Sequence, residues 1–447
     1  LPADGQTTLT AQAEWIPPGE GTFVINGEVL SLDGQATTAS VTVNAAYASP
    51  EAREAALNRQ MQEEVTELRF PAPATIAADV MPELAQPDGD ALHRLLLTGR
   101  QADDEQTIAD EAFALQALDL LFSDAGLRTY LDSVASSDLR AFYDLDSGSL
   151  TLYEPVEPDG AFGRWSGIDQ LTHDLQNERF GLNEMDIAAL DDDARIALRA
   201  LVEGDATFLE YLALQGEMFS AEELAEITVG LSESATDVSA ALPITLQETF
   251  EFAYMAGVPF VKFLYDLDGF DTVDGAWSEL PASSEHIIHP ERYLARDVPA
   301  PVALNPLENI LGQGWRLADT DVFGEFLLRQ HLGQQPLTAE AIDQAATGWG
   351  GGRYAVYHNV AEALPVLVIR LAWDNAEHER EFSALYADYL QRRFGGAEQA
   401  TAGGGRCWLA DGAGCLFKAG GDSLIVRAPT LELATAVAEV QINMSQS

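Results

Sequence analysis

The chain has 447 residues, 47 % of them hydrophobic and 9 % aromatic, which is the composition of a folded protein with material for one large domain or several ordinary ones. It carries 72 acidic against 24 basic residues, so its formal net charge is −48 and its pI is near 4.1. A surface of this charge repels phosphate backbones, which excludes nucleic acid as a partner. It favours solubility, basic partners, or divalent cations at the acidic surface.

The cysteines and the start of the chain predict an exported protein. No stretch of 18 or more apolar residues is present, so the sequence predicts no transmembrane segment. The chain opens at Leu1 without an initiator methionine or a signal-like segment, as a processed mature protein does. Seven residues separate Cys407 from Cys415, and no further metal-ligand pair accompanies them. We expect a disulfide that closes a short hairpin, and therefore a secreted or cell-surface location.

The first 70 residues predict two strand-forming stretches and then a helix. The stretch 22–30 contains the pair Asn26-Gly27, a common hairpin-turn signal, and residues 39–44 alternate as a strand does. A helix is expected to begin at Pro50. Its apolar face would be formed by Leu57, Met61, Val65 and Leu68.

Residues 71–340 predict a mostly helical domain. The stretch 71–105 is rich in proline and aspartate and is expected to be a connection. Apolar residues at helical spacing follow from Ile108 onward, and long helices are expected as far as about residue 340. A strand pair over 141–143 and 150–153, with a turn between its strands, is the one expected interruption.

The last part of the chain, 341–447, predicts a small α+β module that contains the disulfide. Residues 366–371 form a buried-strand pattern, and a helix follows. Short strands at 407–409 and 423–426 precede a closing helix from Thr430. The predicted fold class is therefore α+β, with a predominantly helical core, a C-terminal α+β module and an N-terminal β-containing segment.

Two of the predicted helices carry residues that suggest a metal site. Residues 167–179 have an apolar stripe at helical spacing, so Asp169 and His173 lie on one helix face, one turn apart. The next helix has Glu203 in its middle, followed directly by Gly204. Glycine inside a helix costs about 1 kcal/mol relative to alanine, so it indicates a close backbone approach or a wide turn.

The first of these helices resembles the metal-binding helix of zinc peptidases, with two essential residues exchanged. Those enzymes use H-E-x-x-H, because histidines at i and i+4 reach one metal and the glutamate acts as general base. Here Asp169 takes the first histidine position, Gln170 takes the position of the base, and His173 is retained. Glu203 is of the residue type that a third ligand requires.

Four motifs in order make the resemblance more specific. The chain is similar to secreted bacterial metallopeptidases of the gluzincin type, whose pattern is H-E-L-T-H-A-L-Q-D-Q-x-F, E-G-D-A, S-T-E-Q-x-L-H-P-x-K-Y and G-W-G-G-D-R-Y. The resemblance covers about residues 90–440 and leaves out the first 70. The corresponding segments are Leu171-Thr172-His173-Asp174-Leu175-Gln176-Asn177-Glu178-Arg179-Phe180, Glu203-Gly204-Asp205-Ala206, Ser283-Ser284-Glu285-His286-Ile287-Ile288-His289-Pro290-Glu291-Arg292-Tyr293 and Gly348-Trp349-Gly350-Gly351-Gly352-Arg353-Tyr354.

The resemblance implies a zincin-like fold with an altered site. By position, His173 becomes the second ligand and Glu203 the third, with Asp169 in place of the first histidine. Aspartate ligates zinc, so these three residues could hold zinc weakly or favour a harder ion. Gln170 cannot replace the base, because an amide takes no proton from metal-bound water at any useful pH. No catalytic residue is therefore expected, and zinc is the one cofactor that the site could retain.

The motif at 283–293 has a second implication. His289 and Tyr293 match family residues that we expect to line the cleft. His286 and His289 also form an H-x-x-H beside Glu285, but the match of His289 to the family favours the cleft over a separate metal site. Gly352 stands where the family has an aspartate, which indicates relaxed constraint.

Simpler interpretations of the same residues stay open. His173 alone is as typical of a hydrogen-bonded core histidine as of a ligand. Glu203, if buried, needs a partner, and either His173 or Arg199 would serve.

Three functional hypotheses follow. The first is a secreted, catalytically inactive metallopeptidase-like protein that acts as a structural or binding component of an extracellular or envelope assembly, with protein partners or self-association. The second is an active zinc metallopeptidase that uses an atypical Asp169-His173-Glu203 site. The third is a substrate-binding module that keeps the peptidase cleft.

Overall fold

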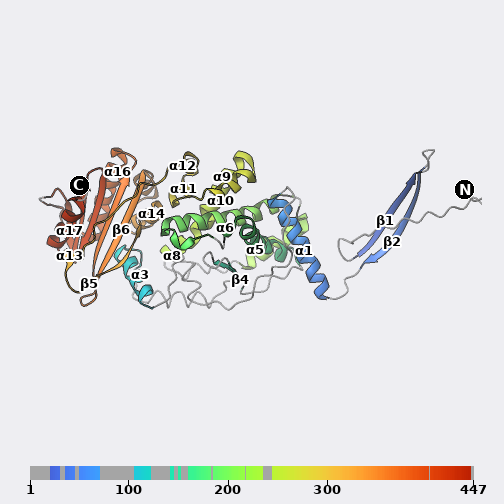
Figure 1. The fold of residues 1–447 in the computed structure, drawn as a ribbon, viewed down its shortest axis with the longest axis horizontal. Coiled ribbons are helices and arrows are strands. Elements are labelled where there is room, and N and C mark those ends of the chain that lie inside the picture. Colours follow the sequence, from blue (N-terminus) through green and yellow to red (C-terminus); the bar gives the residue numbers. More distant parts are fainter. Residues whose placement is uncertain are drawn as a thin grey trace, which may run out of the picture.

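The structure is a computed structural model that describes residues 21–30, 36–45, 50–70, 105–121, 141–144, 149–152, 160–182, 185–216, 218–234, 244–401 and 403–443. Within these ranges the chain is a mixed α+β protein, with helices in the middle of the chain and an antiparallel sheet in its C-terminal part (Figure 1). The predicted α+β class is confirmed at this level. The zincin-like character of the helical core stays a prediction.

The N-terminal segment is a long hairpin followed by a helix. Strands β1 (Gly21–Leu30) and β2 (Ala36–Ala45) pair in antiparallel fashion over their whole length. Asn26 pairs with Ser40 inside this ladder, so the Asn-Gly pair lies in mid-strand and the prediction of a turn there is wrong. The tertiary pairing overrides the local turn signal. Helix α1 (Pro50–Arg69) begins where the sequence predicts.

The middle of the chain is built around one long helix, α6 (Asp192–Gln215), which packs against α5, α8, α9 and α11. Asp191 is the N-cap residue of this helix, and its carboxylate accepts a hydrogen bond from the Ala194 N–H at 2.9 Å. Most of its residues are buried, as in a helix surrounded by others. The neighbouring helices are α5 (Ala161–Phe180), α7 (Ala221–Ser234), α8 (Ile244–Met255), α9 (Gly257–Asp268), α10 (Phe270–Ser278), α11 (Ser284–Ile288) and α12 (Pro290–Ala295), with a short 3₁₀ helix η2 (Ile187–Ala189) before α6.

Helix α1 belongs to this helical core. Met61 and Val65, on its predicted apolar face, are buried against Ile168 of α5 and Leu209 of α6. The predicted strand pair is also present, as β3 (Ala141–Asp144) and β4 (Ser149–Leu152). The predicted turn between them and nearly all of the connection 71–105 lie outside the described residues.

The C-terminal part is a seven-stranded antiparallel sheet in the order β5-β6-β7-β11-β10-β9-β8. Its strands are β5 (Trp315–Val322), β6 (Trp349–Asn359), β7 (Leu364–Trp373), β8 (Gln399–Ala400), β9 (Arg406–Ala410), β10 (Gly412–Ala419) and β11 (Asp422–Ala428). The accompanying helices are α13 (Glu308–Leu311), α14 (Glu325–Gly333), α15 (Ala339–Ala346), α16 (Ala376–Phe394) and α17 (Leu431–Asn443).

Both faces of the sheet are covered. Along β7, Leu367 and Ile369 join the cluster that includes α16, whereas Val366 and Val368 join the cluster that includes α17. Successive residues of a strand point to opposite faces, so a strand covered on both sides shows a continuous apolar run. This explains why β7 was recognised from its sequence.

The sheet begins earlier in the chain than the module predicted over 341–447, because β5 is hydrogen-bonded to β6. Helix α3 (Glu105–Ala117), far earlier in the sequence, also packs on β5, β6 and β7. Asp119, just after α3, accepts from the Arg427 guanidinium of β11 at 2.7 Å. The sheet unit therefore draws on residues that the sequence analysis assigned to the helical domain.

Cys407 and Cys415 form a disulfide, as predicted. They stand opposite each other in β9 and β10, so the bond closes this hairpin across its ladder. No helix among the described residues is long and apolar enough to span a membrane.

Candidate metal centre

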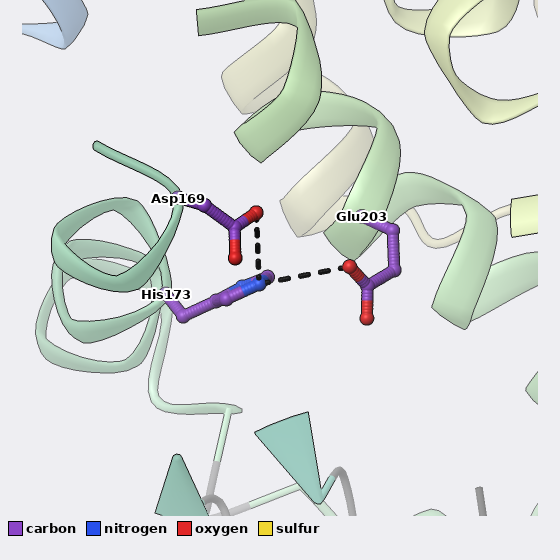
Figure 2. Close-up of side chains that lie close together, drawn as sticks. All are labelled: Asp169, His173 and Glu203. Atoms are coloured by element: carbon purple, nitrogen blue, oxygen red, sulfur yellow. Dashed lines mark ion pairs between the residues drawn. The ribbon is translucent and has the colours of Figure 1, made fainter. Parts of the chain in front are cut away.

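Helices α5 and α6 bring three predicted ligands together. The Nε2 atom of His173 lies 3.6 Å from a carboxylate oxygen of Asp169 and 3.7 Å from one of Glu203 (Figure 2). One ligand atom from each residue lies within 4.8 Å of the other two. Asp169 and His173 share a face of α5, as their spacing requires, and Glu203 reaches them from α6.

The three side chains differ in their access to solvent. His173 and Glu203 are 1 % and 7 % exposed, whereas Asp169 is 29 % exposed. The group is therefore enclosed by protein on the side of α6 and opens to solvent beside Asp169. A metal ion needs such an entry path.

Glu203 is held close to α9 by a contact between two glycines. A Cβ atom on Gly204 would lie 2.5 Å from the carbonyl carbon of Gly257, and one on Gly257 would lie 2.1 Å from the Ala200 carbonyl oxygen. Such distances exclude any side chain at either position. Of the two explanations that the sequence left open for Gly204, the close backbone approach is the one found.

The orientation of the His173 ring is set by Gln176. The amide nitrogen of Gln176 donates to the carbonyl oxygen of Val202 at 3.0 Å and to the Asp205 carboxylate at 3.3 Å. Both partners only accept, so the amide oxygen of Gln176 must face His173 Nδ1, 2.9 Å away. Nδ1 therefore carries a proton, and in the neutral ring Nε2 presents its lone pair toward Asp169 and Glu203.

Asp205 is held in turn by an arginine from α1. The Arg69 guanidinium donates to Asp205 through Nε at 3.1 Å and through an Nη at 3.1 Å. The indole N–H of Trp277 also donates to Asp205, at 3.3 Å. All of these side chains are buried, and Asp205 and Arg69 are 0 % and 1 % exposed. Both oxygens of the buried Asp205 carboxylate therefore accept from Arg69, and the added donors stabilise its charge further.

The electrostatics of the group favour a cation at its centre. Burial disfavours the imidazolium of His173, but Asp169 and Glu203 outweigh it and raise the pKa of the ring to about 10. Burial raises the pKa of Asp169, and the pKa of Glu203 is lowered despite burial because His173, Arg199 and Tyr254 stabilise its charged form. Two carboxylates that face one imidazole nitrogen thus retain a positive charge between them, either a proton or a metal ion.

Two further residues surround the group. Tyr254, near the end of α8, makes a side-chain hydrogen bond with Glu203. Glu210 lies two turns beyond Glu203 on α6, and burial together with repulsion from Asp169 raises its pKa well above the usual range. Gln170, in the position of the missing base, is partly exposed next to Asp169.

The predicted cleft residues have partners of their own. His289 Nε2 lies 3.1 Å from an oxygen of Glu325 in α14, and the Tyr293 hydroxyl donates to the Glu279 carbonyl oxygen at 2.8 Å. His286 lies beside the Asp297 carbonyl oxygen instead, so the two histidines of the H-x-x-H motif have separate partners. A cleft shared by His289, Tyr293 and the metal ligands stays a prediction.

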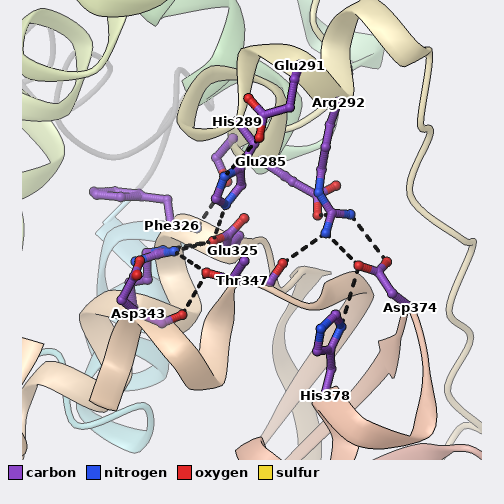
Figure 3. A network of polar contacts seen from close by, with 12 residues as sticks. Glu285, His289, Glu291, Arg292, Glu325, Phe326, Asp343, Thr347, Asp374 and His378 are labelled. Atoms are coloured by element: carbon purple, nitrogen blue, oxygen red, sulfur yellow. Dashed lines mark hydrogen bonds and ion pairs between the residues drawn. The ribbon is translucent and has the colours of Figure 1, made fainter. Parts of the chain in front are cut away.

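His289 and Glu325 belong to a polar network between α11, α12 and the sheet unit (Figure 3). Arg292 makes ion pairs with Glu285 at 3.0 Å and with Asp374, just after β7, at 2.5 Å. His378, also near Asp374, is 3.7 Å from its carboxylate. The third motif of the resemblance therefore supplies a contact between the helical core and the sheet.

Sequence reasoning missed the residues that support the ligands. Gln176 and Asp205 stood within the quoted motifs, and their polar character beside the ligands was a usable signal. Tyr254, Glu210 and Arg69 gave none, because their roles depend on helix packing.

The comparisons with known proteins bear on the sheet alone. A family model described as a domain of unknown function (DUF8575) matches residues 314–438, which span β5 to most of α17. No curated protein and no solved structure matches the chain. The matched region lies outside α5 and α6 and therefore does not include Asp169, His173 or Glu203.

Proposed function

We propose that this protein is an extracytoplasmic, metallopeptidase-like protein that binds a divalent metal ion and lacks peptidase activity. It serves as a binding or structural component of an envelope assembly. The observation that carries the proposal is the convergence of Asp169, His173 and Glu203, with an imidazole nitrogen that faces two carboxylates.

The distances suit a metal centre. Zinc bonds to nitrogen and oxygen at about 2.0–2.2 Å, so two ligands of a tetrahedral site lie roughly 3.3 Å apart. The separations of 3.6 and 3.7 Å need only a small inward shift of the carboxylates. A metal held this way would have an open position toward the exposed side of Asp169. Two carboxylates with one imidazole suit zinc, and they also suit harder ions such as manganese.

The chemistry of Gln170 argues against hydrolysis. In a zinc peptidase the glutamate at this position takes a proton from metal-bound water. Glutamine has no basic group for this step, and removal of a general base costs typically 10²–10⁴-fold in rate. The metal in this protein is then a structural or ligand-binding element.

The extracytoplasmic part of the proposal rests on other features. The disulfide between Cys407 and Cys415 is typical of an oxidising compartment. The net charge of −48 favours basic partners and divalent cations at the surface.

One observation favours the competing function, an active metallopeptidase. Glu210 is a carboxyl group with a raised pKa on the same helix as Glu203, within electrostatic reach of Asp169 and His173. A carboxyl group beside a metal site is the type of residue that acts as a general base or acid. In this alternative it would take the role that Gln170 cannot fill.

Metal titration tests the proposal. Metal-depleted protein, titrated with Zn²⁺ and Mn²⁺ by calorimetry, should bind one ion per chain. His173→Ala should abolish this binding, whereas His378→Ala, which removes an imidazole from α16 instead, should preserve it. The absence of stoichiometric binding by the wild type would contradict the proposal.

A hydrolysis assay separates the two functions. The zinc-loaded wild type should leave an unstructured protein substrate intact over the period in which a control zinc peptidase digests it. Chelator-sensitive hydrolysis that disappears in both His173→Ala and Glu210→Gln would establish the active-enzyme alternative instead.

A further inference from the structure

The most deeply buried arginine of the helical core is Arg69, the last residue of α1, and it is 1 % exposed. Its guanidinium lies over the rings of Phe70 and Phe270, with its central carbon 4.6 and 4.3 Å from their centroids. It makes ion pairs with Asp205 of α6 and with Asp274 of α10. A charged group is stable in such surroundings only when it is paired, so the position of Arg69 is closely defined.

From Arg69, a continuous series of hydrogen bonds leads to the candidate metal ligand. Arg69 donates to Asp205, Gln176 donates to Asp205, and the Gln176 amide oxygen accepts from His173 Nδ1. Arg69, Asp205, Gln176 and His173 are each no more than 1 % exposed. Bulk water therefore cannot readily replace a missing partner in this series.

Each bond in the series constrains the next. Arg69 neutralises Asp205 and holds its carboxylate in place through two parallel donors. The fixed carboxylate and the Val202 carbonyl oxygen together keep the Gln176 amide nitrogen on their side, which leaves the amide oxygen toward His173. That oxygen keeps the proton on Nδ1, so that Nε2 is the ring nitrogen that faces Asp169 and Glu203, where the ion would bind.

We propose that Arg69 is a positioning residue for His173, and that the docking of α1 on the helical core thereby sets the metal affinity of the Asp169-His173-Glu203 site. The inference rests on the proposed metal binding, because it names the element that controls it. It assigns a role to the N-terminal segment, which the family resemblance does not cover.

The expected effect follows from the behaviour of outer partners of metal ligands. Loss of such a partner typically weakens metal binding 10–100-fold. Arg69 acts through two intermediates, so we expect about a tenfold increase in the dissociation constant for Zn²⁺ when it is replaced.

The variants are chosen to keep the protein folded. Arg69→Met alone leaves the buried Asp205 without its cation, which is strongly destabilising. The double variant Arg69→Met/Asp205→Asn removes both charges together and retains side chains of similar size. Arg69→Lys keeps the charge but loses the bidentate geometry. Asp274→Asn is the matched control, because it removes the other partner of Arg69 and leaves the series to His173 intact.

Two measurements are made on the full chain. The first is the Nδ1–H resonance of the His173 ring in the metal-free protein, which the hydrogen bond to Gln176 should shift downfield and protect from exchange. The second is the dissociation constant for Zn²⁺. Circular dichroism confirms that each variant is folded.

We expect the Nδ1–H resonance to shift and to exchange faster in the double variant and in Arg69→Lys, with an approximately tenfold weaker affinity, and to stay unchanged in Asp274→Asn. An unchanged ring resonance in the folded double variant would overturn the inference. If the wild type bound no metal, the proposed function would fail, and the ring resonance would still decide whether Arg69 positions His173.

Discussion

The backbone of Gly204 in α6 lies directly against that of Gly257 at the start of α9. A methyl group on Gly204 would sit 2.5 Å from the Gly257 carbonyl carbon. This contact sets the distance between the two helices at the level of Glu203. It also places Tyr254, three residues before Gly257, within hydrogen-bonding reach of that carboxylate. The geometry of the third ligand thus depends on the absence of two side chains.

Gly204→Ala should therefore destabilise the protein, although alanine is the better helix former by about 1 kcal/mol. The added methyl group must push α9 away, and overpacking of this kind costs typically 1–3 kcal/mol. We expect a net loss of up to about 2 kcal/mol in the free energy of unfolding, measured by urea denaturation, together with weaker metal binding.

Gly275→Ala is the matched control. Gly275 lies within α10, is exposed, and has no atom within 4 Å of the position that a methyl group would take. Helix propensity alone should stabilise this variant by about 0.5–1 kcal/mol. Equal effects of the two substitutions would refute the argument from the helix contact.

Restoration of the zinc-peptidase motif should produce activity. Asp169→His/Gln170→Glu converts the helix to H-E-x-x-H, which supplies a ligand that suits zinc and a base for its bound water. We expect at least tenfold tighter Zn²⁺ binding and hydrolysis of an unstructured substrate roughly 10²-fold or more above the wild type. The assay is fluorogenic peptide cleavage with and without chelator.

The single variants separate the two contributions. Asp169→His should tighten zinc binding without hydrolysis, and Gln170→Glu should leave affinity nearly unchanged. A double variant that binds one zinc per chain yet cleaves nothing would show that the helical core does not present substrates as a peptidase does.

Asp193, at the start of α6, should make stability fall as the pH rises. Burial raises its pKa to about 7, helped by Asp191 and Glu325 and opposed by hydrogen bonds from Ser284. Because this pKa is above that of the unfolded chain, near 3.8, the folded state holds more protons between these two values. The contribution of Asp193 to stability is therefore present at low pH and is lost as the pH rises through about 7.

The measurement is the free energy of unfolding of wild type and Asp193→Asn from pH 5 to pH 8. The asparagine oxygen can still accept from the Ser284 N–H, and it carries no charge to desolvate. We expect the variant to be more stable at pH 8, by up to ~4 kcal/mol, and its pH dependence to be flatter. The control is Asp186→Asn, at an exposed position, whose free energy of unfolding should change with pH as that of the wild type does. An equal change in the free energy of unfolding of both variants would contradict this account.

The disulfide should contribute measurably to the stability of the sheet unit. It closes a loop of eight residues by sequence separation, for which the chain-entropy model gives ~2–3 kcal/mol. The double variant Cys407→Ser/Cys415→Ser should lower the urea midpoint by an amount that corresponds to this free energy. The reduced wild type should have the same midpoint as the double variant. A midpoint equal to that of the oxidised wild type would show that the β9–β10 ladder alone holds the hairpin.

The candidate metal ligands could be predicted because the sequence pattern that identifies them is local. Asp169 and His173 stand at i and i+4, a spacing that puts two side chains on one helix face whatever the fold. The role of Arg69 could not be predicted, because 136 residues of sequence separate it from Asp205. Only the packing of α1 on the helical core brings the two side chains together. Residue type and spacing therefore indicate a candidate ligand set, whereas its supporting partners follow from tertiary structure.

The beginning of strand β6 was mispredicted for a different reason. It opens with Trp349 and three glycines, a composition that disfavours strands. Two of these glycines are required by close contacts, since a Cβ on Gly351 would lie 2.4 Å from the Ala300 carbonyl oxygen and one on Gly352 would lie 2.4 Å from that of Phe323. The glycines favour a tight turn at this tryptophan, followed by a strand. Trp349 is buried, but it already lies in the strand.

The pairing of Asp119 with Arg427 has a consequence for the order of events during synthesis. The two residues are 308 positions apart, so at about 5–20 residues per second the arginine leaves the ribosome roughly 15–60 s after the aspartate. The strands on which α3 packs are also made long after α3, because β5 begins only at Trp315. Most of the helical core is encoded between these two residues and can fold first, whereas the sheet can be completed only after β11 has been made.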